Sequence, residues 1–197
     1  MKTKQLEELL LQSLEHELGG VKVYVAALTC AVNSELKKEW DKYLAETRTH
    51  VTALETVCKA MDIAVKKETP GRAVVRHTGA GLVEAMKMAL AAGDPAAAEL
   101  VAAECVVLAE TKDHLDWELL SKCAVHLTGP GAQALKSACE VIEEQEDEHL
   151  YHTMGWCREL WRQSLGLKAV LPPPEERKHV KTAISAARAE KAAHPER

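Results

Sequence analysis

The sequence predicts an all-α fold in which four long helices form a bundle, and three observations support this. Ala, Leu, Glu and Lys recur throughout the 197 residues, Phe is absent, and alternating patterns of β-branched residues are scarce. Four long segments place apolar residues three and four positions apart, which is the spacing of a buried helix face. Turn signals at Asn33-Ser34 and at residues 128–131 separate these segments.

The first two helices are predicted at about residues 4–31 and 35–65, with Ser34 as the N-cap of the second. The inward positions of the first helix are Leu10, Ser13, Glu17, Gly20, Tyr24, Ala27 and Ala31. Those of the second are Trp40, Leu44, Thr47, Val51, Leu54, Cys58, Met61 and Val65. Each stripe is continuous, so each helix is expected to bury one face against the others.

The third helix is predicted to begin after the Asp94 cap and Pro95 and to end near residue 127. The fourth covers about residues 132–166. Its inward positions are Leu135, Cys139, Ile142, Glu146, His149, Thr153, Trp156 and Leu160. The connection at residues 66–93 contains a short helical stretch at 81–92 and is long enough to run along the bundle.

These elements predict two antiparallel hairpins, because short turns join the first helix to the second and the third to the fourth. A single long crossover then links the second helix to the third. The bundle is expected to occupy residues 1–166. Pro172-Pro173-Pro174 interrupts the polar, Ala-rich remainder, so residues 167–197 are predicted to be a C-terminal tail or a weak docking helix.

Acids and histidines interrupt the predicted core at one height. Glu146 and His149 lie in the middle of an apolar stripe, where an unpaired polar group costs roughly 2–7 kcal/mol. If the first hairpin turns near residue 33, Glu17 faces His50. If the second turns near residue 129, Glu110 lies level with Glu146 and His149. A metal ion or a closed hydrogen-bond network would compensate for their burial.

The third helix leaves its contribution open. Its height along the bundle makes Glu110 the better candidate ligand, whereas the helix face predicted to be inward carries Glu104. His114 can also reach the centre. On the second helix, the position three before His50 is Thr47, and Glu46 lies four before it. Glu46 is therefore on a neighbouring side of the helix, from which it can swing toward the centre.

This arrangement resembles the ferritin-like di-iron carboxylate proteins, and among them the rubrerythrin-like branch. That family places one Glu on the first helix, E-x-x-H on the second, Glu on the third and E-x-x-H on the fourth. Glu17 and the run Glu146-Asp147-Glu148-His149 match, and Tyr24 follows Glu17 at a family-like spacing. Thr47 departs from the pattern because it stands where the family has a Glu.

The resemblance implies a metal site, with ligands Glu17, Glu46, His50, Glu110, Glu146 and His149. Carboxylates and imidazoles suit iron, and also manganese or zinc. One or two iron ions would support redox chemistry with oxygen or peroxide, so the protein is a candidate oxidoreductase. Loss of a ligand at Thr47 favours a single ion. One alternative is a degenerate bundle without metal that acts as a binding or scaffold protein, and another is an oxygenase for a larger substrate.

Composition narrows the partners and the location. A net charge of −5 gives no reason to expect nucleic acid as a partner, and no run approaches the ~20 apolar residues of a membrane span. No secretory signal precedes the first helix, and the six cysteines form no C-x-x-C pair. We therefore expect a cytoplasmic protein with reduced thiols, and the Ala-rich helices make a homodimer the expected assembly.

Overall fold

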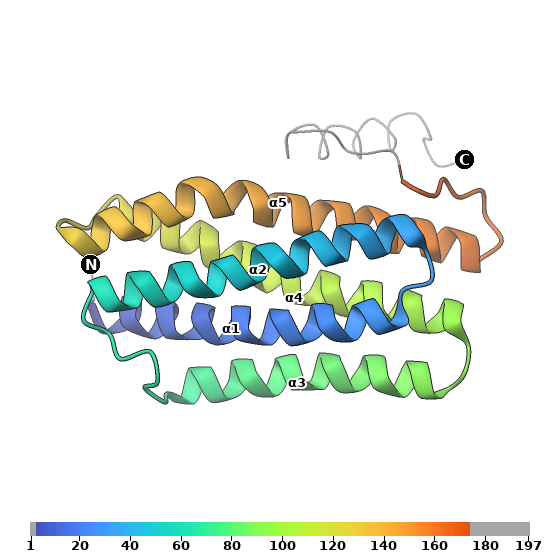
Figure 1. Cartoon of the computed structure of the whole chain (residues 1–197), viewed down its shortest axis with the longest axis horizontal. Coiled ribbons are helices and arrows are strands. Elements are labelled where there is room, and N and C mark those ends of the chain that lie inside the picture. Colours follow the sequence, from blue (N-terminus) through green and yellow to red (C-terminus); the bar gives the residue numbers. More distant parts are fainter. Residues whose placement is uncertain (1–2, 174–197) are drawn as a thin grey trace, which may run out of the picture.

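The computed structural model describes residues 3–173 and contains five α-helices and no strand in that range (Figure 1). The helices are α1 (Thr3–Cys30), α2 (Ser34–Ala60), α3 (Pro70–Ala91), α4 (Pro95–Ala124) and α5 (Pro130–Ser164). The all-α prediction is confirmed. Of the predicted tail, residues 174–197 lie outside the described part of the chain.

Four of the helices form a closed ring. α1 packs against α2 and α4, and α5 packs against the same two helices on the opposite side. α1 and α5 run in one direction and α2 and α4 in the other, so neighbours in the ring are antiparallel (Figure 1). Every helix of the ring therefore turns one face toward a common centre.

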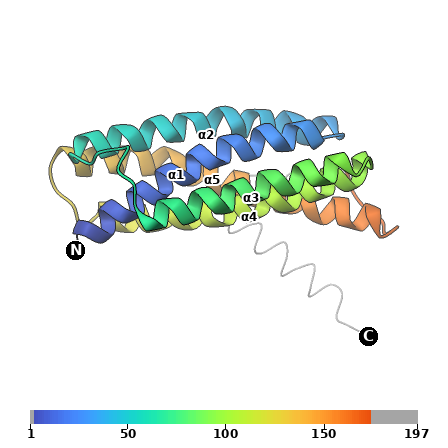
Figure 2. The same cartoon turned by 90° about the horizontal axis from the view of Figure 1, so that it is seen from below.

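The crossover differs from its prediction, because α3 is a full helix of 22 residues rather than a short one at 81–92. It lies outside the ring, against α1 and α4 (Figure 2). The Thr69 side chain accepts a hydrogen bond from the amide of Arg72, and Pro70 occupies the first turn, so the helix begins eleven residues earlier than predicted. At 1.5 Å per residue it spans about 33 Å.

A buried ion pair fixes α3 to the ring. Glu15 on α1 accepts hydrogen bonds from Arg72 at 2.7 Å and from Arg76 at 2.7 Å. Arg72 also donates to the carbonyl oxygens of Val65 and Lys67, which close the loop before α3. Because Arg72 and Glu15 are both buried, removal of Glu15 would leave the Arg72 charge without its partner, whereas removal of Arg72 would leave Glu15 with Arg76 alone.

The apolar core consists of two clusters at opposite ends of the ring. One contains Tyr24, Leu36, Trp40, Tyr43 and Trp156, and the other contains Leu10, Leu14, Leu54, Trp117 and Leu135. Between them, buried acids and histidines occupy the middle of the bundle. The packed ends hold the four backbones in place, so the polar side chains in the middle have fixed positions.

The inward face of α4 differs from the prediction. The face predicted to be inward was the one that carries Glu104, yet Leu108 and Leu115, four and eleven residues further along that face, are 62% and 50% exposed. The buried positions include Ala102, Val106, Ala109, Glu110, Asp113, Trp117 and Leu120. α4 contacts α1, α3 and α5, so apolar residues surround it and periodicity alone does not single out the buried face.

Two properties of the described residues bear on the environment of the protein. No helix between residues 3 and 173 combines the length and apolar character that crossing a membrane requires. The six cysteines are free thiols, and Cys30, Cys58, Cys105 and Cys139 are buried among apolar side chains. Burial raises the pKa of the Cys139 thiol to about 12, so this sulfur is a packing group rather than a nucleophile.

Candidate metal centre

All four helices of the ring contribute to one buried polar cluster. Glu17 comes from α1, His50 from α2, Glu110 from α4, and Glu146 and His149 from α5. None of these side chains is more than 3% exposed. The sequence placed these five residues at one height, and the structure brings them together in two overlapping groups.

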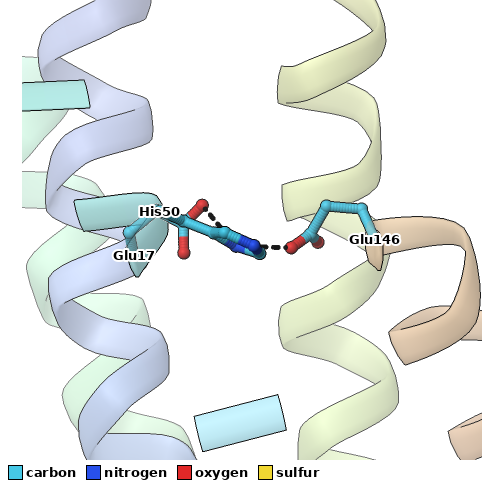
Figure 3. Close-up of side chains that lie close together, drawn as sticks. All are labelled: Glu17, His50 and Glu146. Atoms are coloured by element: carbon cyan, nitrogen blue, oxygen red, sulfur yellow. Dashed lines mark ion pairs between the residues drawn. The ribbon is translucent and has the colours of Figure 1, made fainter. Parts of the chain in front are cut away.

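The first group, here named the His50 half, consists of Glu17, His50 and Glu146. The imidazole of His50 lies between the two carboxylates (Figure 3). Its Nδ1 is 3.0 Å from Glu146 Oε1 and 3.4 Å from Glu17 Oε1. One nitrogen and oxygens from two other helices thus converge on a small volume, which is the arrangement that a cation requires.

The second group, the His149 half, consists of Glu110, Glu146 and His149. His149 Nδ1 is 3.5 Å from Glu110 Oε2 and 3.5 Å from Glu146 Oε1. The two imidazole rings stack with their centroids 5.7 Å apart. Because Glu146 belongs to both halves, the cluster offers two adjacent cation positions with one shared carboxylate.

The outer nitrogen of each histidine is held by a hydrogen bond. His149 Nε2 is 3.0 Å from Glu46 Oε2, and His50 Nε2 is 2.9 Å from Gln145 Oε1. The Gln145 amide nitrogen donates to Glu46 Oε1, which orients its oxygen toward His50. Both Nε2 atoms therefore carry protons as donors, and both Nδ1 atoms face the cluster, as in histidines that bind metal through one nitrogen.

Glu46 was predicted as a ligand, and its position is different from that of the other acids. It bonds the outer nitrogen of His149, whereas the converging oxygens belong to Glu17, Glu110 and Glu146. With 19% of its side chain exposed, Glu46 also connects the cluster to solvent between α2 and α5. This placement supports a role in orienting His149.

The centre of the cluster lacks hydrogen bonds. Among the described residues, most buried polar side-chain atoms without a hydrogen-bond partner lie here: Glu17 Oε2, His50 Nδ1, Glu110 Oε2, Asp113 Oδ1, both oxygens of Glu146 and His149 Nδ1. An unpaired buried polar atom costs about 1–3 kcal/mol, and more when the group is charged. Such a set needs protons or cations to compensate for its burial.

In the metal-free protein, protons compensate for the burial of these groups. Burial lowers the pKa of His50, but the carboxylates of Glu146 and Glu17 outweigh it and raise the pKa to about 11. In the same way Glu110 and Glu46 outweigh burial and raise the pKa of His149 to about 9. Burial and the charge of Glu110 raise the pKa of Glu146 to about 8. At pH 7 these three groups are protonated.

Asp113 is a further acid that the sequence did not single out. It is 3% exposed, and burial together with the charges of Glu146, Glu17 and Glu110 raises its pKa well above its ordinary value. Asp113 lies one helical turn after Glu110 and therefore on the same face. That spacing was the available signal, but the inward face of α4 had been predicted elsewhere.

Aromatic side chains line the cluster. Trp117 Nε1 donates to Glu17 Oε1 at 2.8 Å. The Tyr24 hydroxyl lies beside Glu110 without a well-formed hydrogen bond, and the Tyr43 ring lies 4.3 Å from that of His149, centroid to centroid. The sequence assigned Trp117 and Tyr43 no role, because contacts between helices are not visible in the spacing of residues along one helix.

The other candidates lie elsewhere. Glu104 accepts a hydrogen bond from Trp161 at the surface, and His114 pairs with Asp147 at 3.1 Å, where both are partly exposed. Thr47 is buried, and an added Cβ at Gly20 would lie 3.3 Å from its Cγ2 atom. α1 and α2 thus approach closely where the family has a glutamate, which leaves little space for that side chain.

Comparisons with protein-family models, with curated proteins and with solved structures find no match to this chain. The buried carboxylate and histidine groups are therefore the evidence on which a functional proposal rests.

Proposed function

We propose that this protein is a ferritin-like metalloprotein that binds divalent cations, with iron the principal candidate, in the middle of its helical ring. The supporting observation is the pair of Nδ1 atoms that face unpartnered carboxylate oxygens while both Nε2 atoms hold hydrogen bonds. A histidine that only stabilised the fold would gain most from well-formed hydrogen bonds at both nitrogens. Here the inner nitrogens and oxygens converge without forming them.

The donor set favours a metal of intermediate hardness. Imidazole nitrogen with carboxylate oxygen suits iron, manganese and zinc, whereas no cysteine belongs to either group. Two divalent cations carry four positive charges, which the carboxylates of Glu17, Glu46, Glu110 and Glu146 balance when the histidines are neutral. The packing of α1 and α5 each against both α2 and α4 supports the ferritin-like part of this proposal.

Bound iron would supply one-electron redox chemistry toward oxygen or peroxide. The chain would hold the ions through the two halves, orient the imidazoles through Glu46 and Gln145, and exclude water with Tyr24, Tyr43 and Trp117. Because the ligands are almost fully buried, a small diffusible substrate suits the site better than a large one. The homodimer and the cytoplasmic location stay predictions from the sequence.

The rival function is a scaffold whose buried acids and imidazoles are neutralised by protons alone. It is favoured by the close contact of Gly20 with Thr47 and by the ion pairs of His50 with Glu17 and Glu146. The two functions differ in one observable property, because only the first requires that a cation displaces the protons.

Metal analysis of the full-length protein tests the proposal. The protein is purified without chelator, incubated with Fe²⁺ under anaerobic conditions or with Mn²⁺ or Zn²⁺, desalted and analysed for bound metal. The combined Glu146→Ala and His149→Ala variant removes the shared acid and one imidazole. Its matched control combines Asp147→Ala and His114→Ala, which removes an acid and a histidine from α5 and α4 at the surface.

We expect one or two equivalents of metal in the wild type and in the control, and a loss of at least tenfold in affinity in the site variant. The absence of bound metal from the wild type with all three ions would overturn the proposal. In that case the site variant is also expected to gain stability, because it replaces a buried polar pair that no ligand needs.

A further inference from the structure

The two halves of the centre differ in what holds each histidine from outside. His149 Nε2 bonds a carboxylate, Glu46 Oε2, at 3.0 Å. His50 Nε2 bonds an amide, Gln145 Oε1, at 2.9 Å. Neither this difference nor the position of Gln145 follows from the spacing of the two histidines along the sequence.

A carboxylate and an amide affect an imidazole differently. A carboxylate that accepts the outer N–H makes the inner nitrogen a stronger electron donor, and removal of such a partner typically costs 10–100-fold in metal affinity. A neutral amide holds the ring in orientation but adds no charge. On this ground His149 is the stronger of the two nitrogen ligands.

The carboxylates differ in the same direction. Glu17 Oε1 already accepts a hydrogen bond from the Trp117 N–H at 2.8 Å, and an indole nitrogen can only donate. This oxygen is therefore a weaker donor to a cation than a carboxylate oxygen without such a bond. Within residues 3–173 no comparable fixed donor bonds Glu110 Oε2, because the neighbouring Tyr24 hydroxyl can rotate and serve as donor or acceptor. Glu146 is common to both halves, and its Oε1 lies 3.0 Å from His50 Nδ1 and 3.5 Å from His149 Nδ1, so this shared acid does not contribute to the preference for the His149 half.

We propose that the centre fills in a fixed order, the first cation binding the His149 half and the second the His50 half, and that Glu46 is the positioning residue that sets this order. The inference rests on the proposed function. Once the first cation binds, Glu146 is shared with it, and the positive charge opposes the second ion in the adjacent half. Both effects separate the two affinities.

Titration of the metal-free, full-length protein with Mn²⁺ tests the order, with free Mn²⁺ measured by electron paramagnetic resonance. The wild type is expected to show two binding steps. His149→Gln should remove the tighter step and His50→Gln the weaker one, since glutamine retains a polar side chain that can fill much of the site. Glu46→Gln should weaken the tighter step about 10–100-fold and change the weaker step much less.

Glu148→Gln is the matched control, because Glu148 is an acid on α5 that pairs with the exposed Lys42 of α2. This variant should keep both steps. Loss of the tighter step in His50→Gln, or an unchanged gap between the two steps in Glu46→Gln, would overturn the order. Absence of binding in the wild type with Mn²⁺ and also with Fe²⁺ and Zn²⁺ would instead overturn the proposed function itself, so the two failures are distinguishable.

Discussion

Cation binding at this centre should depend steeply on pH, because the ligands carry protons in the metal-free protein. To fill the His149 half, a cation must displace the protons of His149 and Glu146, whose pKa values are raised to about 9 and about 8. At pH 7 the His149 proton is removed about two pH units below the pKa of that group, and the Glu146 proton about one unit below its pKa. At about 1.4 kcal/mol per unit, the cost is about 4 kcal/mol, or roughly a thousandfold in affinity.

The sign follows from the protonation states. Between pH 6 and pH 7 both groups are still largely protonated, so each bound cation releases up to two protons and its affinity should rise up to about a hundredfold per pH unit. The slope should flatten above pH 9, where both groups are deprotonated. A cation in the His50 half must displace a further proton, from His50, with a pKa of about 11.

Two measurements on one sample test this prediction. Zn²⁺ is added to metal-free protein in a weakly buffered solution with an indicator dye, which counts the released protons, and affinity is measured at several pH values by competition with a chelator. The Asp147→Ala and His114→Ala variant should show the same slope. Binding with no release of protons and a flat pH profile would refute the protonation states assigned to Glu146 and His149.

Three further outcomes are expected. The metal-free protein should melt at a lower temperature as pH rises from 6.5 to about 9. The raised pKa values of His50 and His149 contribute stability that is fully present below pH 6.5 and is lost as pH rises through the pKa values of the folded protein. A melting temperature that stays constant or rises with pH, measured in the presence of chelator, would contradict this. Arg72→Ala should lower the free energy of unfolding by about 3 kcal/mol in urea, the low end for a broken buried pair because Arg76 still binds Glu15. Thr47→Glu should destabilise the metal-free protein by about 1–3 kcal/mol through overpacking against Gly20, and an unchanged urea midpoint would show that the space exists.

The helix phases and heights of the site were predictable because they depend on local geometry. A period of three and four residues fixes which side chains of α5 point inward, and the rise per residue fixes their height. Glu17, His50, Glu146 and His149 therefore converge as the spacing predicted. On α4 the height criterion selected Glu110 correctly, whereas the face criterion pointed to Glu104, because apolar residues surround that helix.

The remaining features depend on contacts between elements that the sequence does not display. The attachment of α3 to the ring depends on Glu15, which lies on another helix and binds Arg72 and Arg76. The placement of Glu46 depends on a histidine of α5, so its position on α2 alone suggested only that it could approach the centre. Tertiary contacts determine these details after the local pattern has set the helices.

Two features affect the number of acid groups in the middle of the bundle: position 47 is a threonine rather than an acid, and Asp113 is a buried acid. Where the ferritin-like pattern has an acid on α2, this chain has a threonine whose hydroxyl bonds the carbonyl oxygen of Tyr43 and whose methyl group faces Gly20. Across the ring, α4 contributes a second buried acid one turn after Glu110, and the charges of Glu146, Glu17 and Glu110 raise its pKa. The buried acids in the middle of this bundle are thus distributed over the helices differently from those of the ferritin-like pattern. A buried aspartic acid surrounded by like charges is stable as the neutral form and would ionise only beside a cation, so the negative charge available to a metal increases as the metal enters.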